Sequence, residues 1–311
     1  MRLNQKLSEK QLLMEFFKFW TKNYPDVITG LNTKFFDLPY LMNRICHIVD
    51  EKVIKRFSPW NLVERESIVV RGRPQTVYQL FGICMLDYLD LYKWFIPTRQ
   101  ESYKLDFIGE LELGRGKDDN GYDTFKEWYT KDFQSFVDYN IQDVEIVDAL
   151  EDKLGLIDLS LTVAYDSKVN YDDIFSQVRV WDTLIANHLM QKNICVPPRE
   201  EHSKETKYEG AYVKEPKPGL YKWVYDLDLT SLYPSIIMQY NMSPETILNG
   251  EVSNIDIENM LATGEAVQSP NGKAIAANGQ HFSTKKIGII PMIIDEMYNE
   301  RVGIKQEMIS A

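Results

Sequence analysis

The sequence has few of the residues that bind transition metals or form covalent cross-links. It contains three cysteines in 311 residues, odd in number and far apart. This pattern argues for a reducing compartment and against both a disulfide framework and a zinc site. Four histidines are equally scattered and form no metal-binding constellation. The cysteines are Cys46, Cys84 and Cys195.

Long hydrophobic runs are also missing. No apolar run reaches the roughly 18 residues that a membrane span needs, and residues 1–10 lack the apolar core of a signal peptide. The net charge of -11 points away from nucleic acid on the simplest interpretation. Enzymes that act on DNA are an exception, because their metal sites collect carboxylates while local basic grooves contact the DNA. Charge alone therefore does not decide the question.

The chain is long enough for two or three domains, and no internal repeat is present. The polar stretch 195–207, which contains Pro197-Pro198, is the best candidate for a domain boundary. Periodicity and turn residues predict helices over 9–23, 38–51, 125–154 (broken once), 178–191 and 295–311, a β stretch over 27–30, a hairpin of 67–70 with 76–79, a strand over 223–229, and loop plus hairpin over 249–290.

One run carries the most chemical information: Tyr225-Asp-Leu-Asp-Leu-Thr-Ser-Leu-Tyr-Pro-Ser-Ile-Ile237. It places the Asp228 carboxylate at the end of an apolar strand. Tyr233 follows five residues later, and Pro234 is expected to hold it extended. A divalent metal beside a nucleotide needs such an oxygen ligand, and the ring could measure the nucleotide's sugar. Without the surrounding residues, a core tyrosine would be the better interpretation of Tyr233.

The segment from Asp228 to Ile236 matches every fixed position of D-x-x-S-L-Y-P-S-I, which is motif A of family B DNA polymerases. The chain therefore resembles that family. The resemblance implies that Asp228 binds both catalytic Mg²⁺ ions with help from a main-chain carbonyl, and that the ring of Tyr233 excludes ribose. Asp226 shares the predicted strand face, but the family pattern selects Asp228. The implied nucleotide-binding residues are Leu229, Ser231, Leu232, Tyr233, Arg301 and Lys305.

A second set of polar candidates lies earlier in the chain. Asn32 and Asp37 fall between a predicted strand and a predicted helix. Tyr139 and Asp143 are four residues apart on a predicted helix and therefore share a face. A phenol beside a carboxylate can orient a water that the carboxylate or its metal activates. Taken singly, Asp37 is better explained as a helix cap, and the Tyr139–Asp143 pair as a solvated face.

Together these residues resemble the Exo II and Exo III motifs of the 3′–5′ exonuclease in family B polymerases, especially the T-even-like phage branch. The resemblance implies that Asp37 and Asp143 bind metal, that Tyr139 positions the attacking water and that Asn32 contacts DNA. The Asp-x-Glu pair of Exo I does not occur before Asp37. Because two-metal cleavage needs carboxylates that bridge both ions, we expect the isolated chain to have little or no exonuclease activity.

Two further segments are implied to contact DNA. Arg71 and Arg73 lie at the tip of the predicted hairpin, where they suit phosphate, although an exposed basic turn is an equal alternative. Tyr208 and Gly210 belong to Tyr208-Glu-Gly-Ala-Tyr212, which resembles the Y-x-G-G/A segment that follows the template strand in family B polymerases.

Arg301 and Lys305 stand four apart on the last predicted helix and resemble the pair that grips the triphosphate at the base of the polymerase fingers. A solvated helix face is nearly as good an explanation. The predicted helix stops without Gly or Pro, so we expect the chain to end inside an element, with motifs B and C beyond it. Tyr171-Asp-Asp173 imitates motif C but precedes motif A, and is interpreted as a surface turn.

The combined prediction is a mixed α/β protein. Residues 1–194 would form an RNase H-like exonuclease domain without its first strands, 195–220 a linker, and 221–311 a partial palm. The function predicted is that of a fragment of a DNA-directed DNA polymerase with a 3′–5′ exonuclease, in the host-cell cytoplasm. Mg²⁺ would be the cofactor; primer-template DNA, dNTPs, a complementary polymerase fragment and a sliding clamp would be the partners. Alternatives are a non-catalytic DNA- or clamp-binding module and a stand-alone nuclease.

Overall fold

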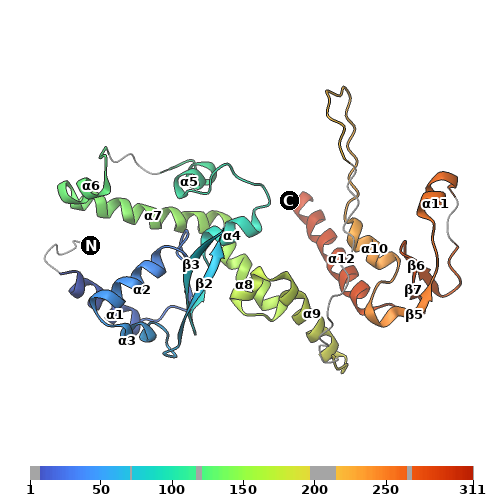
Figure 1. The fold of residues 1–311 in the computed structure, drawn as a ribbon, viewed down its shortest axis with the longest axis horizontal. Helices are drawn as coiled ribbons and strands as arrows, with labels where there is room; N and C mark the ends of the chain where they lie inside the picture. Colours follow the sequence, from blue (N-terminus) through green and yellow to red (C-terminus); the bar gives the residue numbers. More distant parts are fainter. Residues whose placement is uncertain (1–7, 71, 117–120, 197–214, 265–267, 311) are drawn as a thin grey trace. The chain divides into compact units, whose positions relative to one another are not determined.

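The computed structural model of the chain describes residues 8–70, 72–116, 121–196, 215–264 and 268–310. The chain divides into two compact units, which are unit 1 (Met1–Asn187) and unit 2 (His188–Ala311). Helices and strands occur in both (Figure 1), which confirms the predicted α/β class. No helix in the described part of the chain combines the length and apolar character that a membrane crossing requires.

Unit 1 is mostly helical and contains two small β pairings. Its elements are α1 (Glu9–Lys22), β1 (Val27–Ile28), α2 (Asp37–Ile48), α3 (Glu51–Ile54), η1 (Lys55–Phe57), β2 (Val63–Val70), β3 (Arg73–Leu80), β4 (Cys84–Met85), α4 (Tyr88–Phe95), α5 (Leu105–Leu113), α6 (Phe125–Lys131), α7 (Phe133–Leu154), α8 (Leu156–Ser167) and η2 (Tyr171–Phe175). Helix α9 (Gln177–Gln191) continues into unit 2.

Caps explain where several of these helices begin and end. Ser8 and Gln11 form a capping box at the start of α1. The side chain of Asp132 accepts the N–H of Ser135 and starts α7, so the single break predicted within 125–154 falls at Asp132. Gly155, with φ of 60°, ends α7 in the left-handed conformation that glycine adopts without strain.

Two clusters of buried side chains stabilise unit 1. One joins α4, α5, α7 and α8, and the other joins α1, α2, η1 and β3. The fully buried members of the first include Leu86, Tyr88, Leu91, Tyr92, Ile108 and Leu150, and those of the second include Met42 and Phe57.

The β pairings position the loop that precedes Asp37. β1 and β4 run parallel, with Val27 opposite Cys84. Main-chain hydrogen bonds continue past both strands, since the N–H of Tyr88 donates to the carbonyl of Gly30 at 2.9 Å. β2 and β3 form the predicted antiparallel hairpin, which is longer than expected at eight residues per strand.

Unit 2 contains a three-stranded antiparallel sheet in the order β5-β7-β6. The Asn278-Gly279 turn between β6 and β7 was predicted, and Gly279 has the expected positive φ of 84°. The elements of unit 2 after α9 are α10 (Leu232–Gln239), η3 (Pro244–Thr246), β5 (Ile247–Val252), α11 (Ile257–Thr263), β6 (Lys273–Ile275), β7 (Gln280–Ser283) and α12 (Ile289–Ser310).

Two local predictions for the Asp228 segment are wrong. Residues 223–229 form no strand (Figure 1), and Trp223 is 99% exposed. A strand needs a backbone partner, and within the described residues no strand pairs with this segment. Tyr233, expected to be extended, lies instead in the first turn of α10. Pro234 is tolerated there because the first turn needs no N–H donor.

Candidate functional site

Residues 227–234 surround an exposed hollow of about 480 Å³ in unit 2. Ser231, with φ of 55°, turns the chain from an extended segment into α10. This turn places side chains from before and after it around one space. The lining residues are Leu227, Asp228, Leu229, Ser231, Leu232, Tyr233 and Pro234, so the structure gathers all the residues predicted from motif A.

Asp228 and Tyr233 both face solvent in this hollow. Asp228 is exposed, and Tyr233 has 72% of its surface exposed. The alternative interpretation of Tyr233 as a core tyrosine is therefore wrong. Asp226 is exposed as well but does not line the hollow. The choice of Asp228 as the ligand stays a prediction.

The donor chemistry of this hollow suits one kind of metal site. Mg²⁺ prefers oxygen ligands and commonly binds through one or two carboxylates together with substrate phosphates. Asp228 and the carbonyl of Leu229 supply such oxygens. Within the described ranges, no three His, Cys, Asp or Glu side chains gather closely enough to hold a metal alone. The oxygens of the Asp228 hollow therefore suit Mg²⁺ that is also bound by nucleotide phosphates.

Arg301 and Lys305 line a different hollow, on α12. It measures about 490 Å³, and both cationic side chains are exposed. Helices α10 and α12 are in contact within unit 2. The two cations share one helix face as predicted, but they do not line the hollow around Asp228. Their triphosphate-binding role stays a prediction.

The Exo III candidates lie on α7 in unit 1. Tyr139 and Asp143 are both partly buried, so this face of α7 is not fully open to solvent. The ring of Trp128 packs edge-on against Tyr139 with 4.9 Å between ring centroids. Trp128 belongs to α6 and is 2% exposed. The water-positioning candidate is therefore held by a rigid aromatic neighbour.

The Exo II candidates lie around the start of α2. Asp37 is the first residue of that helix, and its N-cap, Phe36, makes no side-chain cap hydrogen bond. Asp37 is exposed as a whole residue, but partial desolvation of its carboxyl raises its pKa, and a hydrogen bond from the Thr33 hydroxyl partly offsets the effect. Asn32 has a φ of 71°, and its main-chain N–H donates to Asp87 Oδ1 at 2.9 Å.

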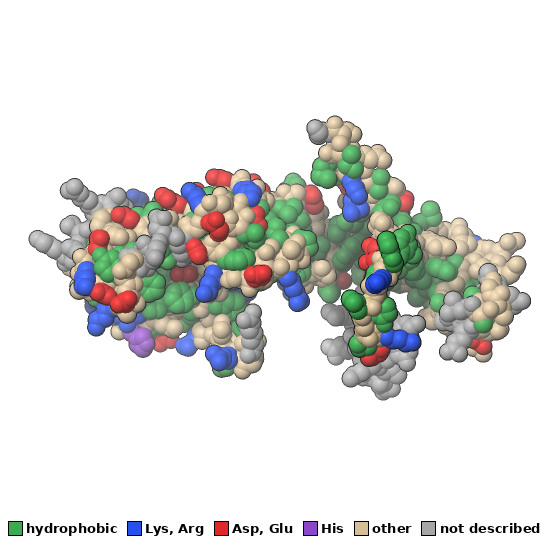
Figure 2. All heavy atoms as spheres, turned by 90° about the horizontal axis from the view of Figure 1, so that it is seen from above, with side chains coloured by type: hydrophobic (Ala, Val, Ile, Leu, Met, Phe, Trp, Pro, Cys, Tyr) green, Lys and Arg blue, Asp and Glu red, His purple; other side chains and the backbone are tan. Residues whose placement is uncertain are grey.

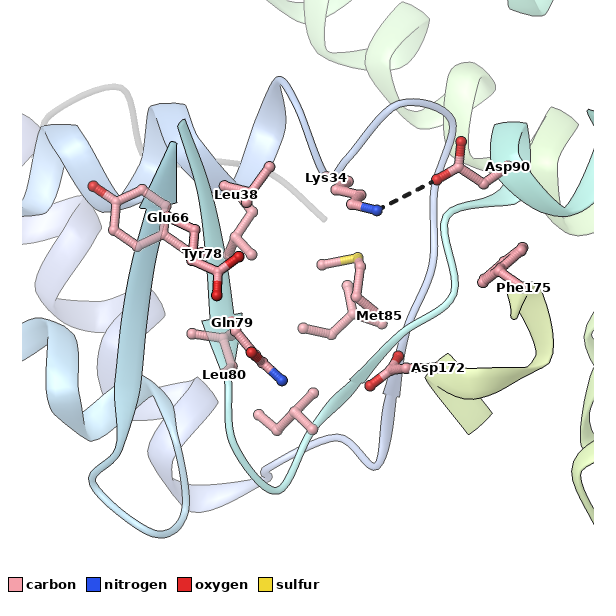
Figure 3. A pocket seen from close by; sticks show the side chains of 13 residues that line it. Lys34, Leu38, Glu66, Tyr78, Gln79, Leu80, Met85, Asp90, Asp172 and Phe175 are labelled. Atoms are coloured by element: carbon pink, nitrogen blue, oxygen red, sulfur yellow. Dashed lines mark ion pairs between the residues drawn. The ribbon is translucent and has the colours of Figure 1, made fainter. Parts of the chain in front are cut away.

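A cavity of about 210 Å³ lies beside the Exo II segment (Figure 3). Lys34 and Leu38 reach it from this segment, and an ion pair of 3.8 Å joins Lys34 to Asp90 at its edge. Neither Asp37 nor Asp143 lines the cavity. It is therefore a neighbour of the predicted exonuclease residues and not a metal pocket built by them.

The predicted DNA-contact residues are only partly described. Arg73 is exposed at the first position of β3, opposite Val70. Arg71, Tyr208 and Gly210 lie outside the described residues. On the face seen in Figure 2, acidic and basic side chains are interspersed over unit 1. The described side chains of unit 1 on that face form no large basic surface.

One residue beside the candidate site was missed by sequence reasoning. Asp87 is 3% exposed and accepts main-chain N–H groups from both Asn32 and Lys34. Its position directly before the aromatic segment at 88–95 marks it as a possible helix cap in retrospect. Its contacts with residues more than fifty positions earlier left no signal in the local sequence.

Comparison with known proteins places both units in one family. Residues 5–108 match the exonuclease domain of DNA polymerase family B, and residues 173–311 match DNA polymerase family B itself. The chain belongs to DNA polymerase family B.

Individual relatives of the chain are DNA polymerases that are longer than the chain itself. The chain is 38% identical over 306 residues to a DNA-directed DNA polymerase of Escherichia phage RB69, covering 98% of the chain and 33% of the relative. It is 36% identical over 303 residues to that of Enterobacteria phage T4, covering 97% and 33%. A DNA polymerase delta catalytic subunit of Candida albicans is 29% identical over 314 residues, covering 96% and 29%. The chain thus spans about a third of the length of these relatives.

Proposed function

We propose that this chain supplies an exonuclease segment and the first part of the palm of a DNA-directed DNA polymerase. In that reaction, the primer 3′-OH attacks the α-phosphate of a dNTP, a phosphodiester bond forms and pyrophosphate leaves. The observation that supports the proposal most directly is the exposed hollow that gathers Asp228 and Tyr233 within the motif A match. The corresponding domain order is 1–194 exonuclease, 195–220 linker and 221–311 palm.

Three residues of the hollow and two cations of α12 have roles in this proposal. The Asp228 carboxylate and the Leu229 carbonyl would hold Mg²⁺ together with the nucleotide phosphates. When bound, Mg²⁺ supplies positive charge that offsets the charge developing on the reacting phosphate. The ring of Tyr233 lies under C2′ of the sugar and leaves no room for a 2′-hydroxyl. Arg301 and Lys305 contribute a planar fork and a point charge to the triphosphate.

The proposal also defines the partners. Primer-template DNA and dNTPs are the substrates, with Arg71, Arg73, Asn32, Tyr208 and Gly210 as DNA contacts. A complementary polymerase fragment and a sliding clamp are further proposed partners, and the host-cell cytoplasm is the proposed location.

The test is primer extension by a chimeric enzyme. Residues 1–311 replace the matching third of the RB69 phage polymerase, and Asp228→Ala is compared with Asp226→Ala. We expect Asp228→Ala to lower the rate by about a thousandfold, because several kcal/mol of charge stabilisation is lost, and Asp226→Ala to retain most activity. Equal losses in both variants would contradict the assignment. Templated extension by the 311-residue chain alone, abolished by Asp228→Ala, would contradict the view that it supplies only part of the palm.

A proofreading exonuclease is the second proposed activity. The Tyr139–Asp143 pair on α7 and the family match of residues 5–108 support it. Asp37 and Asp143 would each contribute carboxylate oxygens to Mg²⁺. We expect the isolated chain to degrade single-stranded DNA slowly or not at all. Rapid Mg²⁺-dependent degradation that Asp37→Ala abolishes would show that the ligand set is more complete than proposed.

A further inference from the structure

A buried carboxylate from a distant part of unit 1 holds the loop that leads to Asp37. Asp87 is 3% exposed. Its Oδ1 accepts the N–H of Asn32 at 2.9 Å, and its Oδ2 accepts the N–H of Lys34 at 2.9 Å. Hydrogen bonds to an ionised acceptor are about twice as strong as neutral ones. The two oxygens thus grip the loop at two points, one on each side of Thr33.

The same carboxylate also caps a helix. Oδ1 accepts the N–H of Leu89 at 3.0 Å and so starts α4. Capping alone would need only this one contact. Both oxygens of Asp87 accept main-chain N–H groups, so neither points toward a metal site. Capping of α4 accounts for the bond to Leu89 but not for the bonds to Asn32 and Lys34.

The grip is reinforced by the main chain on either side. The N–H of Tyr88 donates to the carbonyl of Gly30 at 2.9 Å. This bond continues the β1–β4 pairing and places Asp87 beside the 32–34 loop. Asn32 is held at φ of 71°. Asparagine is one of the few residues that adopt this left-handed region readily, so it suits the turn that the Asp87 contacts hold.

Thr33 carries this constraint to Asp37. Its carbonyl accepts the N–H of Leu38 at 3.0 Å, and its hydroxyl donates to the Asp37 carboxyl. Thr33 Oγ1 lies close to Gly30, where an added Cβ would come within 2.2 Å of it, so glycine leaves the room that this side chain occupies. The 32–34 loop and the first turn of α2 therefore meet at Thr33.

We infer that Asp87 is a positioning residue that fixes the Asn32–Lys34 loop and, through Thr33, orients the carboxylate of Asp37. The metal-binding role of Asp37 rests on the proposed exonuclease function. The mechanical link from Asp87 to Asp37 rests on the contacts of the described residues alone. The two parts can therefore fail independently.

The first measurement is amide hydrogen exchange on the 311-residue chain. Asp87→Asn replaces one acceptor oxygen by an amide nitrogen. With the remaining oxygen in the place of Oδ1, the hydrogen bond that caps α4 at Leu89 stays. Exchange of the Lys34 amide should then accelerate about ten- to a hundredfold. Asp87→Ser keeps a capping hydroxyl but is too short to reach the loop, so both Asn32 and Lys34 should accelerate. Faster exchange confined to α4, or uniform across unit 1, would overturn the inference.

Asp50→Ala is the control. The Asp50 carboxylate also accepts a main-chain N–H, that of Lys52 at the start of α3. We expect it to accelerate exchange at that helix start and to leave Lys34 unchanged. Acceleration of Lys34 by this variant would mean that the loop responds to any loss of stability in unit 1, and would overturn the inference.

The second measurement follows Asp37 directly, through the ¹³C resonance of its carboxyl carbon at fixed neutral pH. Asp87→Asn and the isosteric Thr33→Val should each shift this resonance, and the double variant should shift it no further than the larger single effect. An unmoved resonance in Thr33→Val overturns the inference even if the Asp87 variants do not fold. Additive shifts would overturn it as well, because they would mean two independent routes.

Mn²⁺ then separates the inference from the proposed function. In the wild-type chain, Mn²⁺ should broaden the Asp37 resonance, and Asp87→Asn should need several times more Mn²⁺ for the same broadening. Absence of broadening in the wild type would count against the metal-binding role of Asp37. The exchange pattern and the carboxyl resonance would still decide whether Asp87 positions it.

Discussion

The indole of Trp128 packs edge-on against the phenol of Tyr139, with 4.9 Å between ring centroids and 65° between ring planes. Edge-to-face pairs of this kind add about 0.5–1.5 kcal/mol beyond their buried area. The indole N–H donates to Ser135 Oγ at 3.2 Å, which fixes the rotation of Trp128. The proposed water-positioning tyrosine is thus oriented by a residue from the preceding helix.

We expect Trp128→Ala to lower the free energy of unfolding of unit 1 by about 3–5 kcal/mol, because it removes a large buried side chain and leaves a cavity. Trp60→Ala is the control, since Trp60 is 70% exposed, and should change stability by no more than about 0.5 kcal/mol. Urea unfolding followed by circular dichroism measures both. If both variants lowered the free energy of unfolding equally, burial of Trp128 between α6 and α7 would contribute no more stability than an exposed tryptophan.

The sequence predicted the elements that carry their own local signals. The periodicity of residues 125–154 predicts helix, and Asp132 supplies the cap that divides it. The hairpin of β2 and β3 follows from two β-prone runs around a Gly-containing turn. Motif A singled out Asp228 and Tyr233, and both line one hollow, because residues so close in sequence share a site through local spacing alone.

Elements and contacts that depend on the tertiary environment escaped prediction. The alternation in residues 223–229 predicts a strand, but a strand forms only against a partner. Helix α4 is short and aromatic, and it begins at Asp87, whose contacts lie 55 and 53 residues away. Helices α5, α8 and α11 and strands β4 and β5 were also missed, since their apolar residues follow no clear period.

Asn241 connects three segments of unit 2, and its removal should be costly. It is 8% exposed; its Nδ2 donates to the carbonyls of Ser283 and Lys286 at 2.6 and 2.8 Å, and its Oδ1 accepts the N–H of Gly288 at 2.8 Å. Asn241→Ala leaves buried polar groups without hydrogen-bond partners. We therefore expect the free energy of unfolding of unit 2 to fall by about 2–4 kcal/mol. Faster amide exchange in β7 should report the change, and unchanged exchange there would contradict the prediction.

Asn193→Ala provides the control for backbone conformation. Asn193 has φ of 56°, close to the 54° of Asn241, but it is exposed. Both substitutions lose the tolerance of asparagine for this conformation, and only one loses the buried hydrogen bonds. If Asn193→Ala lowered the free energy of unfolding as much as Asn241→Ala, the effect would come from the backbone conformation and not from the buried hydrogen bonds.

The carboxylate of Glu245 should make unit 2 sensitive to acid. Burial alone would raise its pKa, but hydrogen bonds from the Ser243 hydroxyl and the Ile289 N–H, at the start of α12, outweigh burial and lower the pKa below 4.5. A lowered folded-state pKa means that the stabilisation is present above the unfolded value of 4.5 and is lost as pH falls through the folded value.

Glu245→Gln should therefore flatten the decline of unit 2 stability below pH 4.5. The measurement is the unfolding midpoint of wild type and variant across that range. Glu300→Gln removes an exposed carboxylate of α12 and should leave the decline in place. If Glu245→Gln and wild type declined in parallel, Glu245 would not be the group responsible.

Tyr233 is expected to discriminate against ribonucleotides in the chimeric polymerase. Tyr233→Ala removes the ring proposed to lie under C2′, so the ratio of ribonucleotide to deoxyribonucleotide incorporation should rise about ten- to a hundredfold. Tyr225→Ala, also on the exposed approach to Asp228 at 83% exposure, should leave the ratio unchanged. Single-nucleotide insertion kinetics with matched dNTP and rNTP decide between them, and an unchanged ratio in Tyr233→Ala would refute the sugar-gate role.

Two glycines of unit 2 should respond to alanine with opposite signs. Gly303 lies inside α12, and a Cβ there would meet no atom within 4 Å. Gly303→Ala should therefore stabilise α12 by about 0.5–1 kcal/mol, since alanine loses less conformational entropy in a helix.

Gly279 has φ of 84°, and a Cβ there would lie 1.9 Å from the Ser253 carbonyl oxygen. Gly279→Ala should destabilise the β5–β7–β6 sheet by at least about 1 kcal/mol. Amide exchange in α12 and β7 measures each effect where it arises, and destabilisation by Gly303→Ala would mean that α12 needs flexibility at the turn between Arg301 and Lys305.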